Sequence, residues 1–197
     1  GGNIVYLTSD MKQKHYIIVC DTDNQIIDKK EIGISSEYSV NSIYYCDDKY
    51  YISAYMVELS NSEKSYPSSI FVLDNSFNVE DEIIDIETEQ INGLVYLGTD
   101  CYAVYSYDEK TDTTYFEVSD GEMITTSDIK EFEGKVRFFH KGKKDSVYAA
   151  SDKKVVIYNI FSGQSESVTE IQTEENKTYE ILYCDDESFA YTVKNSS

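Results

Sequence analysis

The segment Ile43-Tyr-Tyr-Cys-Asp-Asp-Lys-Tyr-Tyr-Ile-Ser-Ala-Tyr55 places two short apolar runs on either side of an Asp-Asp turn. Without a gap it aligns with Val95-Tyr-Leu-Gly-Thr-Asp-Cys-Tyr-Ala-Val-Tyr-Ser-Tyr107, which begins 52 residues later. A third copy runs from Ile181 to Tyr191, and a fourth, from Phe138 to Tyr148, has a longer and basic turn. Short apolar runs bounded by Asp, Asn, Ser, Lys or Gly are typical of strands. The chain therefore repeats a pair of antiparallel strands.

The spacing of the copies predicts the architecture. The first two copies begin 52 residues apart, and the later ones follow at intervals of about 43 residues. A repeat of that size with four short strands is the signature of a propeller blade. We expect an all-β, propeller-like array of four-stranded antiparallel blades, three of them whole and two partial. The expected single domain, 1–197, divides into blade units 3–40, 41–90, 91–134, 135–177 and 178–197. An unrelated all-β meander is the alternative.

A family resemblance follows from three segments. Ser151-Asp-Lys-Lys-Val-Val-Ile-Tyr-Asn-Ile-Phe-Ser-Gly-Gln164 resembles the third strand of a WD40-type blade, with Tyr-Asn where that family has Trp-Asp. Tyr45-Cys-Asp-Asp48 and Tyr183-Cys-Asp-Asp186 resemble the turn after that family's innermost strand. No copy contains the family's Gly-His dipeptide or a true Trp-Asp. The resemblance implies a divergent, partial WD40-like propeller. The last strands of the chain, further sequence or a second chain would complete the ring.

Composition excludes several function classes. The 197 residues carry 17 Lys and Arg against 37 Asp and Glu, a formal net charge of −20. Nucleic-acid binding needs clustered basic residues, so we expect no nucleic-acid partner. No uninterrupted apolar run exceeds five residues, so we expect no membrane span. With 41% hydrophobic residues, 19 of the 197 being Tyr, the chain is too apolar for an acidic disordered tail.

The residues that usually carry chemistry are sparse or badly spaced. Only two His occur, and the four Cys have no C-x-x-C spacing, so we predict unpaired, buried thiols. Unpaired thiols favour a cytoplasmic location, and an extracytoplasmic one stays open. The Asp-rich segments 21–24, 47–48 and 108–112 lack the Gly and Glu of an EF-hand loop and are typical of turns. We predict no catalytic residue, metal or cofactor.

The leading hypothesis for function is a non-enzymatic scaffold that binds a protein or basic peptide on an acidic loop face. In WD40-like blades the d–a and b–c loops emerge on one face, where strands a to d are counted from the inside. The expected d–a loops are 35–40, 87–90, 131–134 and 173–177, and the longest b–c loop is 58–67. These loops carry the candidate partner-binding residues Glu37, Glu63, Tyr66, Glu87, Glu89, Glu131, Glu133, Glu174 and Glu175.

Two alternatives remain open at this stage. In the first, the acidic loops form no binding site, because an acidic protein has acidic loops everywhere and net charge by itself supports solubility. An extracytoplasmic propeller that binds or hydrolyses carbohydrate is the second alternative, because the chain has many Tyr rings and many carboxylates.

Overall fold

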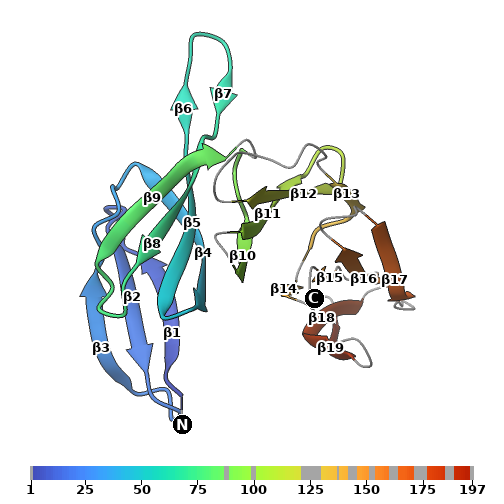
Figure 1. The fold of residues 1–197 in the computed structure, drawn as a ribbon, viewed down its shortest axis with the longest axis horizontal. Helices are drawn as coiled ribbons and strands as arrows, with labels where there is room; N and C mark the ends of the chain where they lie inside the picture. Colours follow the sequence, from blue (N-terminus) through green and yellow to red (C-terminus); the bar gives the residue numbers. More distant parts are fainter. Residues whose placement is uncertain are drawn as a thin grey trace. The chain divides into compact units, whose positions relative to one another are not determined.

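The computed structural model of this chain consists of antiparallel β-sheets joined by turns and loops (Figure 1). It describes residues 2–86, 89–98, 101–120, 130–136, 138–141, 146–150, 154–159, 164–170, 177–184 and 189–195. Within these ranges every regular element is a strand, which confirms the predicted all-β class. The same ranges hold no helix with the length and apolarity that a membrane crossing needs.

The chain forms two compact units, Gly1–Leu94 and Val95–Ser197, which are described one at a time. The first unit has a three-stranded sheet in the order β1-β2-β3 and a four-stranded sheet in the order β4-β5-β8-β9. A two-stranded hairpin, β6-β7, interrupts the chain between β5 and β8. The strands are β1 Ile4–Ser9, β2 His15–Cys20, β3 Ile26–Glu31, β4 Tyr38–Cys46, β5 Lys49–Met56, β6 Glu58–Leu59, β7 Lys64–Ser65, β8 Ser68–Leu73 and β9 Val79–Ile86.

The second unit contains two four-stranded sheets and a final pair, with strand orders β10-β11-β12-β13, β14-β15-β16-β17 and β18-β19. Its strands are β10 Gly93–Gly98, β11 Cys101–Asp108, β12 Thr113–Asp120, β13 Lys130–Glu133, β14 Phe138–Lys141, β15 Ser146–Ala150, β16 Lys154–Asn159, β17 Gln164–Glu170, β18 Lys177–Cys184 and β19 Phe189–Asn195.

This array agrees with the predicted blades. In the described ranges, three four-stranded sheets follow a three-stranded sheet and precede a two-stranded one. Apart from the β6-β7 hairpin inserted between β5 and β8, the strands of each sheet are neighbours in chain order, so each sheet is an antiparallel meander of blade size. β16, in the segment that resembles a WD40 strand, is the third strand of its sheet, as predicted. That the whole chain is one domain stays a prediction.

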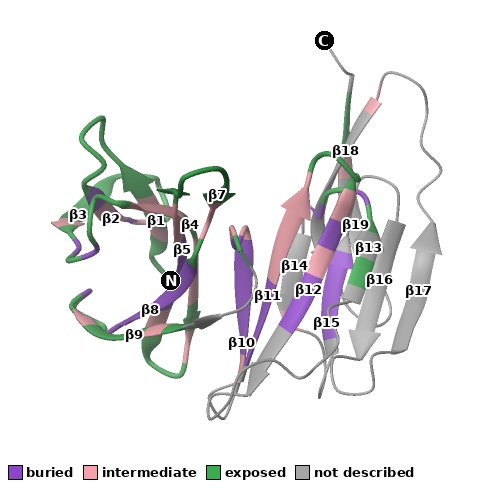
Figure 2. Cartoon of the chain, turned by 90° about the horizontal axis from the view of Figure 1, so that it is seen from above, coloured by how far each residue is buried: buried purple, intermediate pink, exposed green. Residues whose placement is uncertain are grey.

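In each unit, neighbouring sheets pack face to face. In the first unit Ile17 and Val19 of β2 share a core with Ile52 of β5 and with Phe71 and Leu73 of β8. Residues two apart on a strand face the same side, which is why this alternation forms a continuous apolar face. Figure 2 shows β8 buried along its length, in agreement with its six buried residues. The first two sheets are therefore held together by their inner faces.

The core of the second unit follows the same plan. Ala103 of β11 and Phe116 of β12 pack with Val147 and Ala149 of β15, and Val136 of the intervening loop completes the cluster. Val147 and Ala149 are both fully buried. Small residues on both faces allow the two sheets to approach closely, as packed layers require.

Two predicted boundaries were wrong in the first unit. β4 begins at Tyr38 instead of Ile43, so the expected loop 35–40 is shorter. The strand extends because the Tyr38 ring packs edge-on against Phe71, with centroids 5.0 Å apart, and its hydroxyl donates to Glu82 Oε1 at 2.8 Å. The expected open loop 58–67 contains the β6-β7 hairpin, in which Glu58 pairs with Ser65 and Leu59 pairs with Lys64.

Candidate functional site

The strand register brings several loops of the first unit to one end. Tyr38 pairs with Met56, Tyr55 with Ser68, and Ser68 with Ile86, so β4, β8 and the neighbouring strands begin or end there. The β6-β7 hairpin projects from this end (Figure 1). We call it the hairpin end; it comprises residues 10–14, 32–37, 57–67 and 89–92. Within this unit the loops expected as d–a and b–c connections thus lie at one end.

A buried histidine anchors the first of these loops. His15, the first residue of β2, is fully buried. Its Nε2 lies 3.2 Å from the carbonyl oxygen of Ser35, and its Nδ1 lies 2.7 Å from Ser9 Oγ. Because a carbonyl oxygen only accepts, Nε2 donates to it, while Nδ1 shares a hydrogen bond with the serine hydroxyl. The backbone N–H of Ile32 also donates to the carbonyl of His15 at 3.0 Å. These hydrogen bonds therefore hold the loop before β4 against the start of β2.

The next sheet uses a serine at the same structural position. Ser68, the first residue of β8, is buried, and its Oγ accepts a hydrogen bond from the backbone N–H of Ile91 at 3.0 Å. Ile91 is itself fully buried. The side-chain amide of Asn41 donates to the carbonyl of Ile91. Both backbone polar groups of this buried loop residue are thus satisfied, as burial requires.

In the second unit a threonine near the start of β12 holds a loop in the same way. Thr114 is fully buried; its hydroxyl donates to the carbonyl of Gly134 at 2.8 Å and accepts from the backbone N–H of Val136 at 3.3 Å. In all three sheets a buried polar side chain at or near the start of the next-to-last strand holds the loop that follows the sheet. These loops are therefore preorganised rather than loosely attached.

Two predicted site residues meet at the hairpin end. The backbone N–H of Tyr66 donates to Glu89 Oε2 at 3.3 Å, and the backbone N–H of Gln90 donates to the carbonyl of Tyr66 at 2.9 Å. The ring of Tyr66 lies edge-on to Tyr55, with centroids 6.0 Å apart. Tyr66 is half-buried and Glu89 is exposed. The structure therefore joins the loop after β9 to the base of the hairpin.

Glu37 and Glu63 lie at the same end, and both are exposed. Glu37 directly precedes β4, where its backbone N–H donates to Ser35 Oγ at 3.3 Å. Glu63 closes the tip of the hairpin, where its carbonyl oxygen accepts from the backbone N–H and the hydroxyl of Ser60. Both contacts use backbone atoms of the glutamates, so their carboxylates extend from an ordered backbone.

The remaining predicted residues are placed differently. Glu131 and Glu133 are exposed, but they belong to the second unit and lie within β13, opposite Tyr115 and Thr113. The expectation that they belong to a loop was wrong, because the alternation Lys130-Glu-Phe-Glu133 continues the sheet. Glu87, Glu174 and Glu175 lie outside the described residues. A rim of carboxylates that joins the two units therefore stays a prediction.

The sequence analysis did not predict two exposed apolar residues, Leu59 in β6 and Val57 directly before it. Leu59 is 78% exposed and Val57 is 52% exposed. The alternation Val57-Glu-Leu59, followed by the polar turn 60–63, is a signal of a short hairpin that could have located them. Apolar side chains that are exposed close together on a projecting element, unlike single ones scattered over a surface, are candidates for contact with another molecule.

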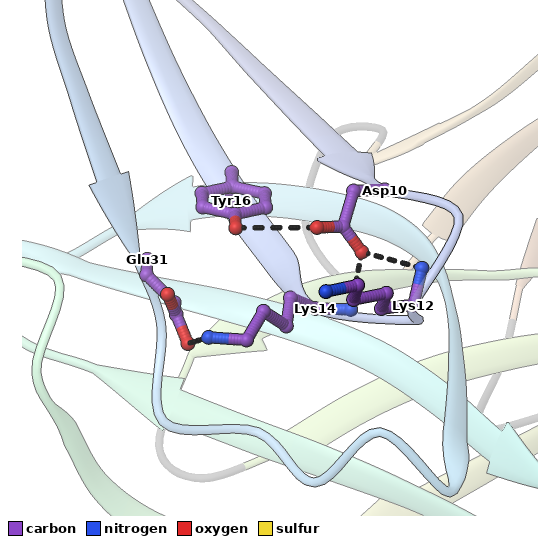
Figure 3. A network of polar contacts seen from close by, with 5 residues as sticks. All are labelled: Asp10, Lys12, Lys14, Tyr16 and Glu31. Atoms are coloured by element: carbon purple, nitrogen blue, oxygen red, sulfur yellow. Dashed lines mark hydrogen bonds and ion pairs between the residues drawn. The ribbon is translucent and has the colours of Figure 1, made fainter.

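The hairpin end also carries basic groups (Figure 3). Lys14 forms an ion pair with Glu31 at 2.8 Å, which raises the pKa of the lysine through the hydrogen bond between them. The carboxylate of Asp10 accepts from the backbone N–H groups of Lys12 and Lys14, at 2.8 and 3.0 Å. The hydrogen bond from Lys14 is the main cause of the lowered pKa of Asp10. The surface is therefore mixed in charge here.

The opposite end, which we call the turn end, comprises residues 21–25, 47–48 and 74–78. It has as many acidic residues as the hairpin end in fewer positions, and it has no Lys or Arg. Asp21 Oδ1 accepts from the backbone N–H of Asp23 and Gln25, and Asp74 Oδ1 accepts from Ser76 and Asn78. These carboxylates shape turns, in agreement with the reading of the Asp-rich segments. Among the described residues, no group of three or more His, Cys, Asp or Glu has the geometry of a metal site.

Comparison with known proteins adds the following. No known protein family matches the chain by sequence, and no curated protein does. Among solved structures the chain is similar to the AfRom2 CNH domain, with a TM-score of 0.49, 12% identity, and coverage of 96% of this chain and 56% of that one. It is also similar to the extracellular domain of BT4673 from B. thetaiotaomicron, with a TM-score of 0.47, 12% identity, and coverage of 100% and 37%.

A third similar structure is the tricorn protease, with a TM-score of 0.41 and 12% identity. The similarity covers 99% of this chain and 24% of that one. The chain thus spans between about a quarter and about half of the length of these three proteins.

Proposed function

We propose that this chain is a non-enzymatic protein- or peptide-binding domain whose partner docks on the hairpin end of the first unit. The observation that carries the proposal is the projecting β6-β7 hairpin, with Leu59 at 78% and Val57 at 52% exposure. Exposed apolar anchors surrounded by polar groups are typical of protein-binding surfaces. Neither side chain belongs to the core of the unit.

The charge of the hairpin end would determine which kind of partner binds there. Glu37, Glu63 and Glu89 extend from three different loops of this end, on a chain with a net charge of −20. Carboxylates around an apolar anchor favour a partner with Lys or Arg at its rim and steer its approach at low salt. The ion pair between Lys14 and Glu31 neutralises one part of this surface and leaves these three glutamates outside it.

The rigidity of the loops at the hairpin end supports the same function. His15 and Ser68 hold the loops before β4 and after β9 through buried hydrogen bonds, so little order has to be gained when a partner binds. The proposal extends to the whole chain as a divergent, partial WD40-like propeller, in which Glu87, Glu174 and Glu175 would belong to further acidic loops. The array of four-stranded sheets and the resemblance of residues 151–164 support this extension.

The test is an array of Lys- and Arg-rich peptides, read in parallel with a glycan array. The wild-type chain should bind a subset of the basic peptides, and Leu59→Ser should lose most of that binding. Ile84→Ser is the matched control, because Ile84 is 65% exposed on β9 and lies outside the hairpin end. The proposal is contradicted if every basic peptide that binds the wild type also binds Leu59→Ser, or if glycans bind and peptides do not.

A further inference from the structure

The turn end of the first unit contains a groove of about 740 Å³ between its two sheets. Val19, Ile27 and Asp28 line it from the first sheet, and Tyr45, Tyr50 and Phe77 line it from the second. A mostly apolar concavity of this size, with a few polar groups, is typical of ligand-binding pockets. The groove lies at the opposite end from the hairpin, so it is independent of the proposed docking surface.

A β-bulge explains how neighbouring residues of β3 both reach the groove. Val19 pairs with Asp28 and Cys20 pairs with Ile26, so Ile27 is the extra residue. Residues directly opposite on paired strands share a face, and Val19 faces the second sheet as part of the core. Asp28 therefore faces the second sheet as well. Bulges of this kind redirect side chains next to binding sites.

The second sheet contributes a row of three aromatic rings. Tyr45 and Tyr50 are opposite each other on β4 and β5, with centroids 4.7 Å apart, and Tyr50 is 4.9 Å from Phe77. Donation to Asp48 raises the pKa of Tyr45, and burial raises the pKa of Tyr50, so both phenols are neutral near pH 7. Neutral rings present the negative face that attracts cations.

Phe77 occupies a backbone conformation that suits it badly. Its φ is 60°, in the left-handed region, where the equivalent turns have Gln13 and Asn24. For an aromatic residue this conformation is a genuine outlier, since Gly and Asn adopt it more readily. Phe77 is nevertheless 8% exposed, with its ring against Tyr50. The strained backbone of this turn thus places the Phe77 ring in the groove.

The charge of the groove selects its ligand. Among the described residues that line it, Asp28 is the one ionisable side chain besides the two tyrosines. The nearby ammonium group of Lys30 donates to Ser76 O and Asn78 Oδ1 in the turn that carries Phe77. A carboxylate beside three rings complements a cation that has an apolar neighbour, by charge attraction and by cation–π contact.

We propose that this groove binds a short peptide segment in which an aromatic or aliphatic side chain stands next to an arginine or lysine. The apolar side chain lies against Phe77 and Tyr50, and the cation lies between Asp28 and the Tyr45 ring. This inference does not depend on the proposed function of the hairpin end.

The absence of Trp from the chain provides a selective assay. The probe is Ac-Gly-Trp-Arg-Leu-Gly-NH2, whose Trp emission is excited without exciting the 19 Tyr. Entry into the apolar groove should shift this emission to the blue and saturate with protein concentration. The matched probe with Glu in place of Arg should bind several-fold more weakly. Equal binding of the two probes would overturn the charge argument.

Three variants test whether the probe binds in the groove. Phe77→Asn retains a residue that accepts the left-handed turn and removes the ring, and should weaken binding about tenfold or more. Asp28→Asn should weaken it about two- to fivefold, as expected for an exposed charge pair. Tyr45→Ala, at a side chain that is 51% exposed, provides a second test should Phe77→Asn fail to fold, and should weaken binding several-fold.

Two controls separate this site from the rest of the surface. Tyr6→Ala removes a ring that is 46% exposed and does not line the groove, and Leu59→Ser alters the hairpin end; both should bind the probe like the wild type. Loss of binding in either control, unchanged binding in Tyr45→Ala, or displacement of the probe by a neutral oligosaccharide such as cellotetraose would overturn the proposal.

Discussion

Ser68 Oγ accepts a hydrogen bond from the backbone N–H of Ile91 at 3.0 Å, and both residues are buried. This contact fixes the loop after β9 to the start of β8. Ser68→Ala removes the acceptor and leaves a buried N–H, which costs about 1–3 kcal/mol of unfolding free energy. Urea denaturation should detect this loss. Ser60→Ala, at an exposed hydroxyl of the hairpin, should change the stability by less than about 0.5 kcal/mol.

The same logic applies in the second unit. Thr114→Val keeps the shape of the side chain but removes the hydroxyl that bonds both Gly134 and Val136. Because one donor and one acceptor then remain buried, the destabilisation should be about 1–3 kcal/mol, measured in the same way. Thr8→Val, at an exposed position of β1, is the control. Equal stability of Thr114→Val and the wild type would refute the anchoring role.

The turn aspartates predict a dependence of stability on pH. The pKa of Asp74 lies below its usual value of 3.8, chiefly because its carboxylate accepts the backbone N–H of Asn78. A lowered folded-state pKa means that the carboxylate stabilises the fold above the unfolded-state pKa and loses this contribution as the pH falls through the folded-state pKa.

Asp74→Ala should therefore lower Tm by a few degrees at pH 7, and the difference from the wild type should shrink progressively below about pH 4. Thermal melts between pH 2.5 and 7 give this comparison. Asp23→Ala, at an exposed carboxylate of a neighbouring turn, should show a smaller difference at pH 7. A difference that grows on acidification would contradict the sign of the shift.

A partial propeller leads to a separate prediction about the stability and oligomeric state of the isolated chain. In the described residues the first sheet has three strands and the last has two, whereas the three large sheets between them have four each. Unpaired strand edges invite pairing with another chain. We predict that the isolated chain is marginally stable or forms an oligomer in size-exclusion chromatography with light scattering. A very stable, strictly monomeric species would count against a partial propeller.

The sequence predicted much of the sheet structure because the strands alternate and the turns are rich in Asp. Ser68–Leu73 and Val79–Ile86 are strands between the expected loops 58–67 and 87–90. The start of β4 was missed because a bulge between Val40 and Ser42 breaks the alternation. The β6-β7 hairpin was missed because each strand has two residues, and a run of two carries no periodicity.

The sites were predicted less well, for reasons of geometry. Glu89 and Tyr66 are 23 residues apart, and only the register of β8 with β9 brings them together. Phe77 was not recognised because a left-handed turn position normally favours Asn or Gly. The scarcity of His was taken as a sign against chemistry, and His15, one of the two in the chain, serves as a buried structural anchor. Such roles depend on spatial neighbours that spacing in the sequence does not reveal.

The central claim is that a basic partner docks on the hairpin end, and a matched pair of charge reversals tests it most directly. Glu37→Lys/Glu63→Lys changes two exposed carboxylates at that end, and Asp23→Lys/Asp81→Lys makes the same change in net charge at or near the turn end. The measurement is the affinity for a Lys- and Arg-rich peptide selected on the array, at two salt concentrations. The account predicts a loss of about tenfold for the first variant and a much smaller loss for the second. Equal losses in the two variants would mean that only bulk charge attracts the peptide, and would contradict a docking site at the hairpin end.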